Sequence, residues 1–140
     1  MSCLSSTVAG SWYPGSADEL RHMLNQYAEQ IPDADRHGPT PNILILPHAG
    51  YCYSVPTALY GLARIMGAGF RRVIVLAPSH RYGFRDRLVA PESSLLSTPF
   101  GAIPLDETAL LTLKKGFPVD RSDAVHTEEH AAQIEYPLLQ

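Results

Sequence analysis

The sequence lacks most of the features that would assign it to a specialised class of protein. It contains only two cysteines, Cys3 and Cys52, which are too few for a disulfide framework and make a reducing cytoplasm the expected location. No apolar run approaches the roughly 20 residues of a transmembrane helix. The first residues have neither the basic nor the apolar region of a signal peptide. We therefore expect neither a membrane protein nor a secreted, disulfide-rich domain.

The charge pattern also argues against a polyanionic partner. The formal net charge is -3, and the basic residues are scattered along the chain. Nucleic acids and anionic membranes select concentrated positive charge, so we expect neither as a partner. The sequence has no phosphate-binding P-loop, no GxGxxG turn, no nucleophile-elbow serine and no CxxC pair.

The sequence does contain short, strongly apolar runs, and two of them are followed by a histidine. Ile43–Leu46 precedes His48, and Val73–Ala77 precedes His80. Both runs are continuously apolar, which is typical of strands covered on both faces in a parallel sheet. A helical pattern beginning at Pro56 separates them. This stretch therefore predicts a strand–helix–strand crossover.

Further helices are predicted on either side of this crossover. Ser16 is the expected N-cap of a helix over about Ala17–Gln30, and Asp106 is the expected N-cap of a later helix. A last helix is predicted to begin near Thr127. With 45% hydrophobic residues, the 140 residues are enough for one domain with a core. We predict a single α/β domain over residues 1–140, with a mostly parallel central sheet and helices on both faces.

His48 and His80 are the candidate metal ligands. In open α/β sheets, ligands bind beyond the carboxyl ends of the strands, and adjacent strands lie about 4.8 Å apart. Two imidazoles at this edge can reach the separation of about 3 Å expected of nitrogens that share one ion. The alternative is that both histidines only cap strand ends. Two ligands do not complete a catalytic metal site, so a third is needed.

His126 and His130 are the candidate catalytic residues. They flank Thr127, Glu128 and Glu129, an order that does not match the HExxH motif of a zinc helix. Each histidine is a candidate acid or base, and His130 or Glu129 is a candidate partner of the metal ligands. The alternative is a polar helix start with one half-buried histidine.

Four residues near the two candidate metal ligands are predicted to line a substrate pocket: Tyr51, Tyr53, Ser79 and Tyr82. Tyrosine rings would suit a small phenolic ligand or a peptide. Ordinary packing is the alternative for each tyrosine.

Five blocks of the sequence resemble the Memo-like family, in the order found in that family. They are VAGSWYPGSADEL at Val8–Leu20, PHAGYCYS at Pro47–Ser54, VIVLAPSHR at Val73–Arg81, TPFGAIPLD at Thr98–Asp106 and EEHAAQIEYPLLQ at Glu128–Gln140. The resemblance implies a fold like that of the class III extradiol ring-opening dioxygenases. It also implies a metal site at one sheet edge, with His48 and His80 as the metal-site histidines.

The sequence departs from the family pattern in composition and in length. Val55 stands where the family has glycine, Ala131 where it has serine, and Gln133 where it has glutamate. Family members are roughly twice as long, and their third metal-site residue, a cysteine, lies in the C-terminal half together with an Asp/His pair. Cys52 is not its equivalent. The resemblance therefore implies the N-terminal portion of a Memo-like domain, incomplete at its C-terminus.

The resemblance and the candidate site together predict a metal-dependent, dioxygenase-like oxidoreductase. The expected cofactor is a divalent metal, Fe(II) first, with zinc or copper as alternatives. A non-catalytic module that binds a peptide or phosphotyrosine in the same pocket and a zinc-dependent hydrolase are the alternative functions. Because an incomplete domain exposes apolar surface, a homo-oligomer is also expected.

Overall fold

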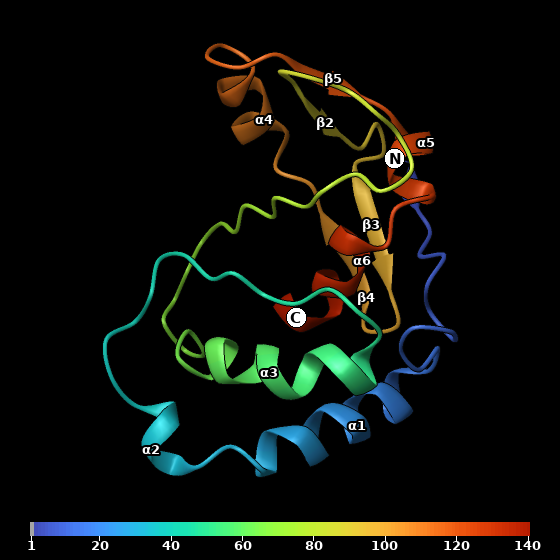
Figure 1. The fold of residues 1–140 in the computed structure, drawn as a ribbon. Helices are drawn as coiled ribbons and strands as arrows, with labels where there is room; N and C mark the ends of the chain where they lie inside the picture. The colour runs from blue at the N-terminus through green and yellow to red at the C-terminus, as the bar shows by residue number, and fades with distance from the viewer. Residues whose placement is uncertain (1) are drawn as a thin grey trace.

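A computed structural model describes residues 2–140 and has a mixed α/β fold (Figure 1). The α/β class predicted from the sequence is confirmed. In chain order the elements are β1 Cys3–Leu4, α1 Ala17–Glu29, α2 Asp33–Arg36, α3 Tyr51–Ala63, β2 Leu88–Ala90, β3 Leu95–Thr98, β4 Gly101–Pro104, α4 Glu107–Leu113, β5 Val119–Arg121, α5 Asp123–Thr127, α6 Ala131–Glu135 and the 3-10 helix η1 Tyr136–Leu139. None of the helices in the described residues has the length and apolar character needed to cross a lipid bilayer.

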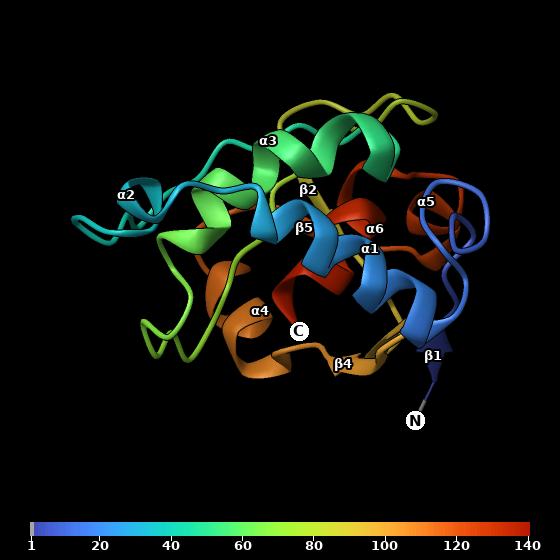
Figure 2. The same cartoon turned by 90° about the horizontal axis from the view of Figure 1, so that it is seen from below.

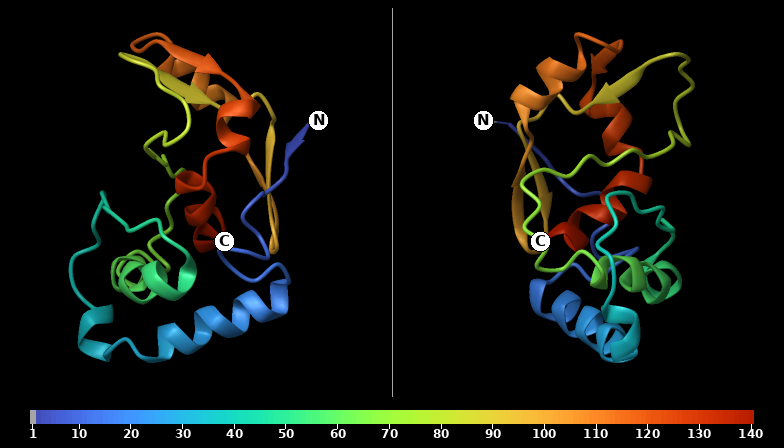
Figure 3. Two further views of the ribbon diagram at one scale, coloured as in Figure 1. Left: turned by 45° about the vertical axis from the view of Figure 1, so that its right-hand side comes forward. Right: turned by 90° about the vertical axis from the view of Figure 1, so that its left-hand side faces the viewer.

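The strands form two small sheets. In one, β3 lies between β1, to which it is parallel, and β4, to which it is antiparallel. In the other, β2 and β5 are parallel, with Leu88 opposite Val119. Helices α1 and α3 lie at one end of the molecule, and β2, β5 and α4 lie at the other (Figures 1 and 3). The β3–β4 hairpin and α6 lie between these two ends.

Helix α6 joins the two hydrophobic clusters of the fold. On one side, Ile134 packs with Leu20 of α1 and with Tyr51 and Val55 of α3. On the other side, Ala132 packs with residues of β1 and β3. Figure 2 shows α6 behind α1, close to the start of α3. The residues after His130 therefore hold the helical end and the sheet end of the molecule together.

Helix α1 begins as its capping pattern predicts. The Ser16 hydroxyl accepts a hydrogen bond from the Glu19 backbone N–H, and the helix ends at Glu29. Asp106 caps α4 in the same way by accepting from the Ala109 N–H. These two local predictions are confirmed because capping needs only residues close together in sequence.

The two predicted central strands lie outside both sheets, and this part of the sequence interpretation is wrong for residues 2–140. Leu44 and Leu46 pack against α3 at Gly61, where an added Cβ would lie 3.2 Å from Leu44. Ile43 and Ile45 face solvent and are 82% and 96% exposed. Half-buried and exposed side chains alternate along residues 43–46 as they do along a strand, but only one of the two apolar faces of this segment is covered. Without a second layer and a neighbouring strand, no β ladder forms.

Helix α3 begins earlier than predicted, at Tyr51, so Pro56 lies inside it. The Tyr51 N–H donates to the Trp12 carbonyl, and the Tyr51 ring is fully buried. This burial outweighs the loss of the one helical hydrogen bond that Pro56 cannot donate. The helix predicted to begin near Thr127 is also different. The structure has two short helices there, α5 and α6, and Glu128–His130 separate them.

Replacing Tyr51 with phenylalanine is expected to destabilise the protein. The buried Tyr51 hydroxyl donates to the Ile134 carbonyl at 2.8 Å, and its loss leaves a buried acceptor without this partner. We expect the free energy of unfolding to fall by about 1–2 kcal/mol in chemical denaturation. Tyr53→Phe, on the same helix but 80% exposed, is the matched control and should change it little. Equal losses in both variants would contradict a structural role for the Tyr51 hydrogen bond.

Glu135 should make stability fall as pH rises. Burial raises the pKa of Glu135 from 4.5 to about 7, so the folded state binds a proton that the unfolded state has already lost. Stability from this group is fully present below about pH 4.5 and is lost as pH rises through about 7. Glu135→Gln should therefore raise the free energy of unfolding at pH 8 by about 3 kcal/mol and leave it unchanged at pH 4. Thermal unfolding at both pH values tests this, and a stabilisation independent of pH would contradict it.

Candidate metal centre

Three histidines from distant parts of the chain lie together. One ring nitrogen from each of His48, His80 and His130 lies within 4.8 Å of the others. The ring centroids are 5.4 Å apart for His48 and His80, 5.8 Å for His48 and His130, and 4.7 Å for His80 and His130. The chain therefore brings together the two histidines predicted as metal ligands and adds a third.

His48 is placed by the start of α3. Three residues after it, Tyr51 inserts its ring into the core and donates its backbone N–H to the Trp12 carbonyl at 2.9 Å. Gly50 passes close to the same carbonyl, since an added Cβ would lie 3.5 Å from the Trp12 oxygen. The turn after His48 is thus held against the loop that carries Trp12.

His80 is held by Glu129, a carboxylate that is only 5% exposed. Glu129 accepts hydrogen bonds from the His80 backbone N–H and from the Ala131 N–H, and its Oε1 lies 2.9 Å from His80 Nδ1. Burial by itself would raise the pKa of Glu129, but these hydrogen bonds outweigh burial and lower it to about 2. Glu129 is therefore ionised across the physiological range.

His130 lies between two aromatic rings. The indole of Trp12 stacks on it at 4.3 Å between centroids, and the His80 ring stacks at 4.7 Å. Burial lowers the pKa of His130, and the nearby His80 and His48 lower it further, while Glu129 opposes the change. The neutral imidazole is favoured, and this is the form that coordinates a metal ion.

The donor set fits a divalent metal ion. Nitrogens that share one tetrahedral ion at about 2.1 Å lie about 3.4 Å apart, so the three rings would need to tilt and close by roughly 1 Å. The His80 side chain is 42% exposed, and movement of this size is within reach of a side chain at the surface. Three imidazoles suit zinc, copper or iron.

The structure places the other candidate residues differently. His126 lies in α5, with Nε2 at 3.0 Å from the Val89 carbonyl, and it is not part of the three-histidine cluster. Burial lowers the pKa of His126. Tyr51 is a core residue and does not line a ligand pocket, because its ring is fully buried. Tyr53 is exposed on α3.

Ser79 and Tyr82 stay close to the cluster through the loop that carries His80. The Ser79 hydroxyl accepts from the Tyr82 N–H, and the Tyr82 hydroxyl donates to Glu128 at 3.1 Å. Their predicted contact with a ligand remains a prediction. Sequence reasoning missed Trp12. It gave His130 as a candidate acid or base and as a candidate partner of the metal ligands, but not as a candidate ligand.

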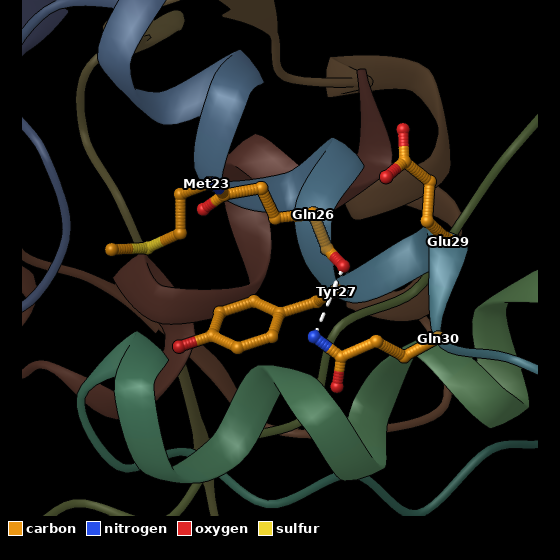
Figure 4. Close-up of a pocket in the computed structure, with 5 residues that line it drawn as sticks. All are labelled: Met23, Gln26, Tyr27, Glu29 and Gln30. Atoms are coloured by element: carbon orange, nitrogen blue, oxygen red, sulfur yellow. Dashed lines mark hydrogen bonds between the residues drawn. The ribbon is translucent and has the colours of Figure 1, made fainter.

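A surface hollow of about 500 Å³ lies along α1, and none of the three clustered histidines lines it. Figure 4 shows Met23 and Tyr27 on the side of α1 that faces α3, with Gln30 donating to the Gln26 carbonyl. Glu29 is the only ionisable carboxylate in its lining, which contains no histidine or cysteine. The hollow therefore has no donor set comparable with that of the histidine cluster.

Comparisons with known proteins cover almost the whole chain. Residues 5–140 match the family model described as Memo-like protein. The chain is 34% identical over 152 residues to the MEMO1 family protein MHO1 of Saccharomyces cerevisiae, an alignment that covers 99% of this chain and 44% of that protein. It is 30% identical to a MEMO1 family protein of Nitrosopumilus maritimus, covering 95% of this chain and 50% of the relative. The chain thus spans about half the length of the curated relatives it matches.

Proposed function

Because the chain belongs to the Memo-like protein family, we propose that it binds a divalent metal ion through His48, His80 and His130. One observation carries the proposal: three imidazoles from three separate segments converge to within 4.8 Å. Two of the three histidines, His80 and His130, also contact the buried carboxylate of Glu129, and His130 stacks on Trp12. Such supporting contacts are typical of metal sites.

We propose Fe(II) as the ion and a dioxygenase-like oxidoreductase as the function. Bound iron would supply redox chemistry with O₂. The chain's own residues would provide three imidazole donors, the buried carboxylate of Glu129, and the Trp12 ring over His130. Trp12 is 38% exposed, so its ring is available to a flat aromatic ligand near the cluster. A small phenolic compound is the proposed substrate class.

A zinc-dependent hydrolase is the second candidate. Three histidines with an open fourth position are the donor set of catalytic zinc sites, which differs from the two-histidine, one-carboxylate set of many iron oxygenases. Glu129 is occupied by N–H donors in this structure, so the direct donors are the three imidazoles. Metal identity therefore separates the two candidate reactions.

A binding module for a peptide or phosphotyrosine is a third candidate, because Arg81 lies close enough to His130 to lower its pKa. A positive charge near an imidazole would suit an anionic aromatic group. A cytoplasmic location remains part of the proposal, since both cysteines are free and exposed.

Metal analysis of three variants tests the proposed site. We expect bound metal in the purified wild-type protein, and we expect His48→Ala, His80→Ala and His130→Ala each to weaken metal affinity by more than about 100-fold. His22→Ala, an exposed residue of α1, is the control and should change nothing. Fluorescence of Trp12, the only tryptophan, gives a second readout, because binding at His130 changes the ring stacked on it.

The outcomes separate the candidate functions. Iron, together with oxygen uptake on addition of catechol-like compounds, would support the oxidoreductase, and zinc would support the hydrolase. Protein that takes up no metal but binds a phosphotyrosine peptide would support the binding module. Metal content that is unchanged in both His48→Ala and His80→Ala would rule out the proposed site.

We also propose that the 140-residue chain self-associates through the uncovered side of residues 43–46 and 73–77. Ile43, Ile45, Ile74 and Leu76 are all largely exposed there. For this chain we propose a second copy as the cover.

Light scattering tests self-association directly. We expect a mass above the 15.3 kDa of one chain at micromolar concentration, falling to that of the monomer in the double variant Ile43→Thr, Ile45→Thr. Leu111→Thr, an exposed apolar residue of α4, is the control and should leave the mass unchanged. Wild-type protein that runs as a monomer at every concentration would contradict the proposal.

A further inference from the structure

Glu129 makes several polar contacts within the candidate site. Oε2 accepts from the His80 backbone N–H, while Oε1 accepts from the Ala131 backbone N–H and lies 2.9 Å from His80 Nδ1. Oε1 is also 3.3 Å from Nδ1 of His130. One buried carboxylate therefore touches two of the three clustered histidines.

The contacts define which nitrogen of His80 carries its hydrogen. Backbone N–H groups can only donate, so both oxygens of Glu129 act as acceptors. The ring contact at Oε1 is then favourable only if His80 Nδ1 is also a donor. A neutral His80 with hydrogen on Nδ1 has its free lone pair on Nε2, the atom on the other side of the ring.

The position of His80 depends on this contact because no β ladder holds it. In residues 2–140, the segment that precedes His80 lies outside both sheets. Glu129, in contrast, is fixed at its own backbone. The Gln133 amide donates to the Glu129 carbonyl at 3.0 Å and to the His126 carbonyl at 2.8 Å, and its oxygen accepts from the Thr7 N–H. The hydrogen bonds of Gln133 therefore fix the backbone that bears the Glu129 carboxylate, and the carboxylate in turn contacts a loop that has no such fixed backbone.

We propose that Glu129 is the positioning residue of the metal site, which holds His80 in the Nδ1–H tautomer and presents its Nε2 to the ion. This role rests on the proposed metal-binding function, but the tautomer can be measured without metal. Glu129 acts through His80 and does not itself bind the ion. Gln133, which stands where the family resemblance predicts glutamate, supports it by donating hydrogen bonds that a carboxylate does not.

Nitrogen-15 NMR of the imidazole rings, on the full chain without metal at about pH 8, tests the tautomer. We expect His80 of the wild type to carry its hydrogen on Nδ1, and Glu129→Ala to shift His80 to a mixture with the Nε2–H form. Glu129→Gln keeps the shape but has a single acceptor oxygen, so an intermediate shift is expected. A wild-type His80 that carries its hydrogen on Nε2 would overturn the proposal without any variant.

Titration with Zn²⁺ or Co²⁺ alone then measures the effect on affinity. We expect Glu129→Ala to raise the dissociation constant about 10–100-fold and Glu129→Gln to raise it less. Glu128→Gln is the matched control: it alters the adjacent carboxylate, which bonds Tyr82 in the same loop but no histidine, and should change neither readout.

The two proposals fail in different ways. Glu129 variants that keep the wild-type tautomer and the wild-type affinity would overturn the positioning role while leaving the metal site intact. Wild-type protein that binds no metal, yet has an Nδ1–H tautomer lost in the Glu129 variants, would overturn metal binding while supporting the positioning of His80. If Glu129→Ala does not fold, Glu129→Gln and the wild-type tautomer decide the question.

Discussion

A buried contact between Tyr51 and Ile134 determines where most of the candidate site lies. Both side chains are fully buried, and the Tyr51 hydroxyl donates to the Ile134 carbonyl at 2.8 Å. Tyr51 follows His48 by three residues, and Ile134 follows His130 by four. Locking α3 to α6 therefore brings these two histidines together, although they are more than eighty residues apart in sequence. The hydrophobic core and the site are thus built by the same contact.

His80 reaches the site by a different route. Its segment is not held by a sheet, and a polar contact with Glu129 takes the place of strand pairing. Burial makes that contact strong, since a carboxylate that is 5% exposed has little water to compete with its N–H donors. The candidate site therefore combines two histidines positioned by apolar packing with one positioned by a charged side chain. Loss of the core would separate His48 from His130, whereas loss of the carboxylate would remove contacts to His80 and to His130.

The segments before His48 and His80 have apolar side chains that the rest of the fold leaves exposed. Both segments have apolar residues on two faces in sequence, but α3 covers only one face of the first, at Leu44 and Leu46. The other side of the first segment, at Ile43 and Ile45, faces solvent.

The sequence by itself determined the features that depend on neighbouring residues and on motif identity. Ser16 and Asp106 predicted the starts of α1 and α4, because an N-cap side chain accepts a hydrogen bond from an N–H only three residues away. The conjunction of the PHAGY and PSHR blocks indicated the Memo-like family and singled out His48 and His80. The tertiary structure alone decided the rest. It placed His130 beside those histidines, stacked Trp12 on His130, put Tyr51 in the core, and kept Ile43–Leu46 out of a sheet. Each of these outcomes depends on what covers a side chain or pairs with a backbone, and such partners lie far away in sequence.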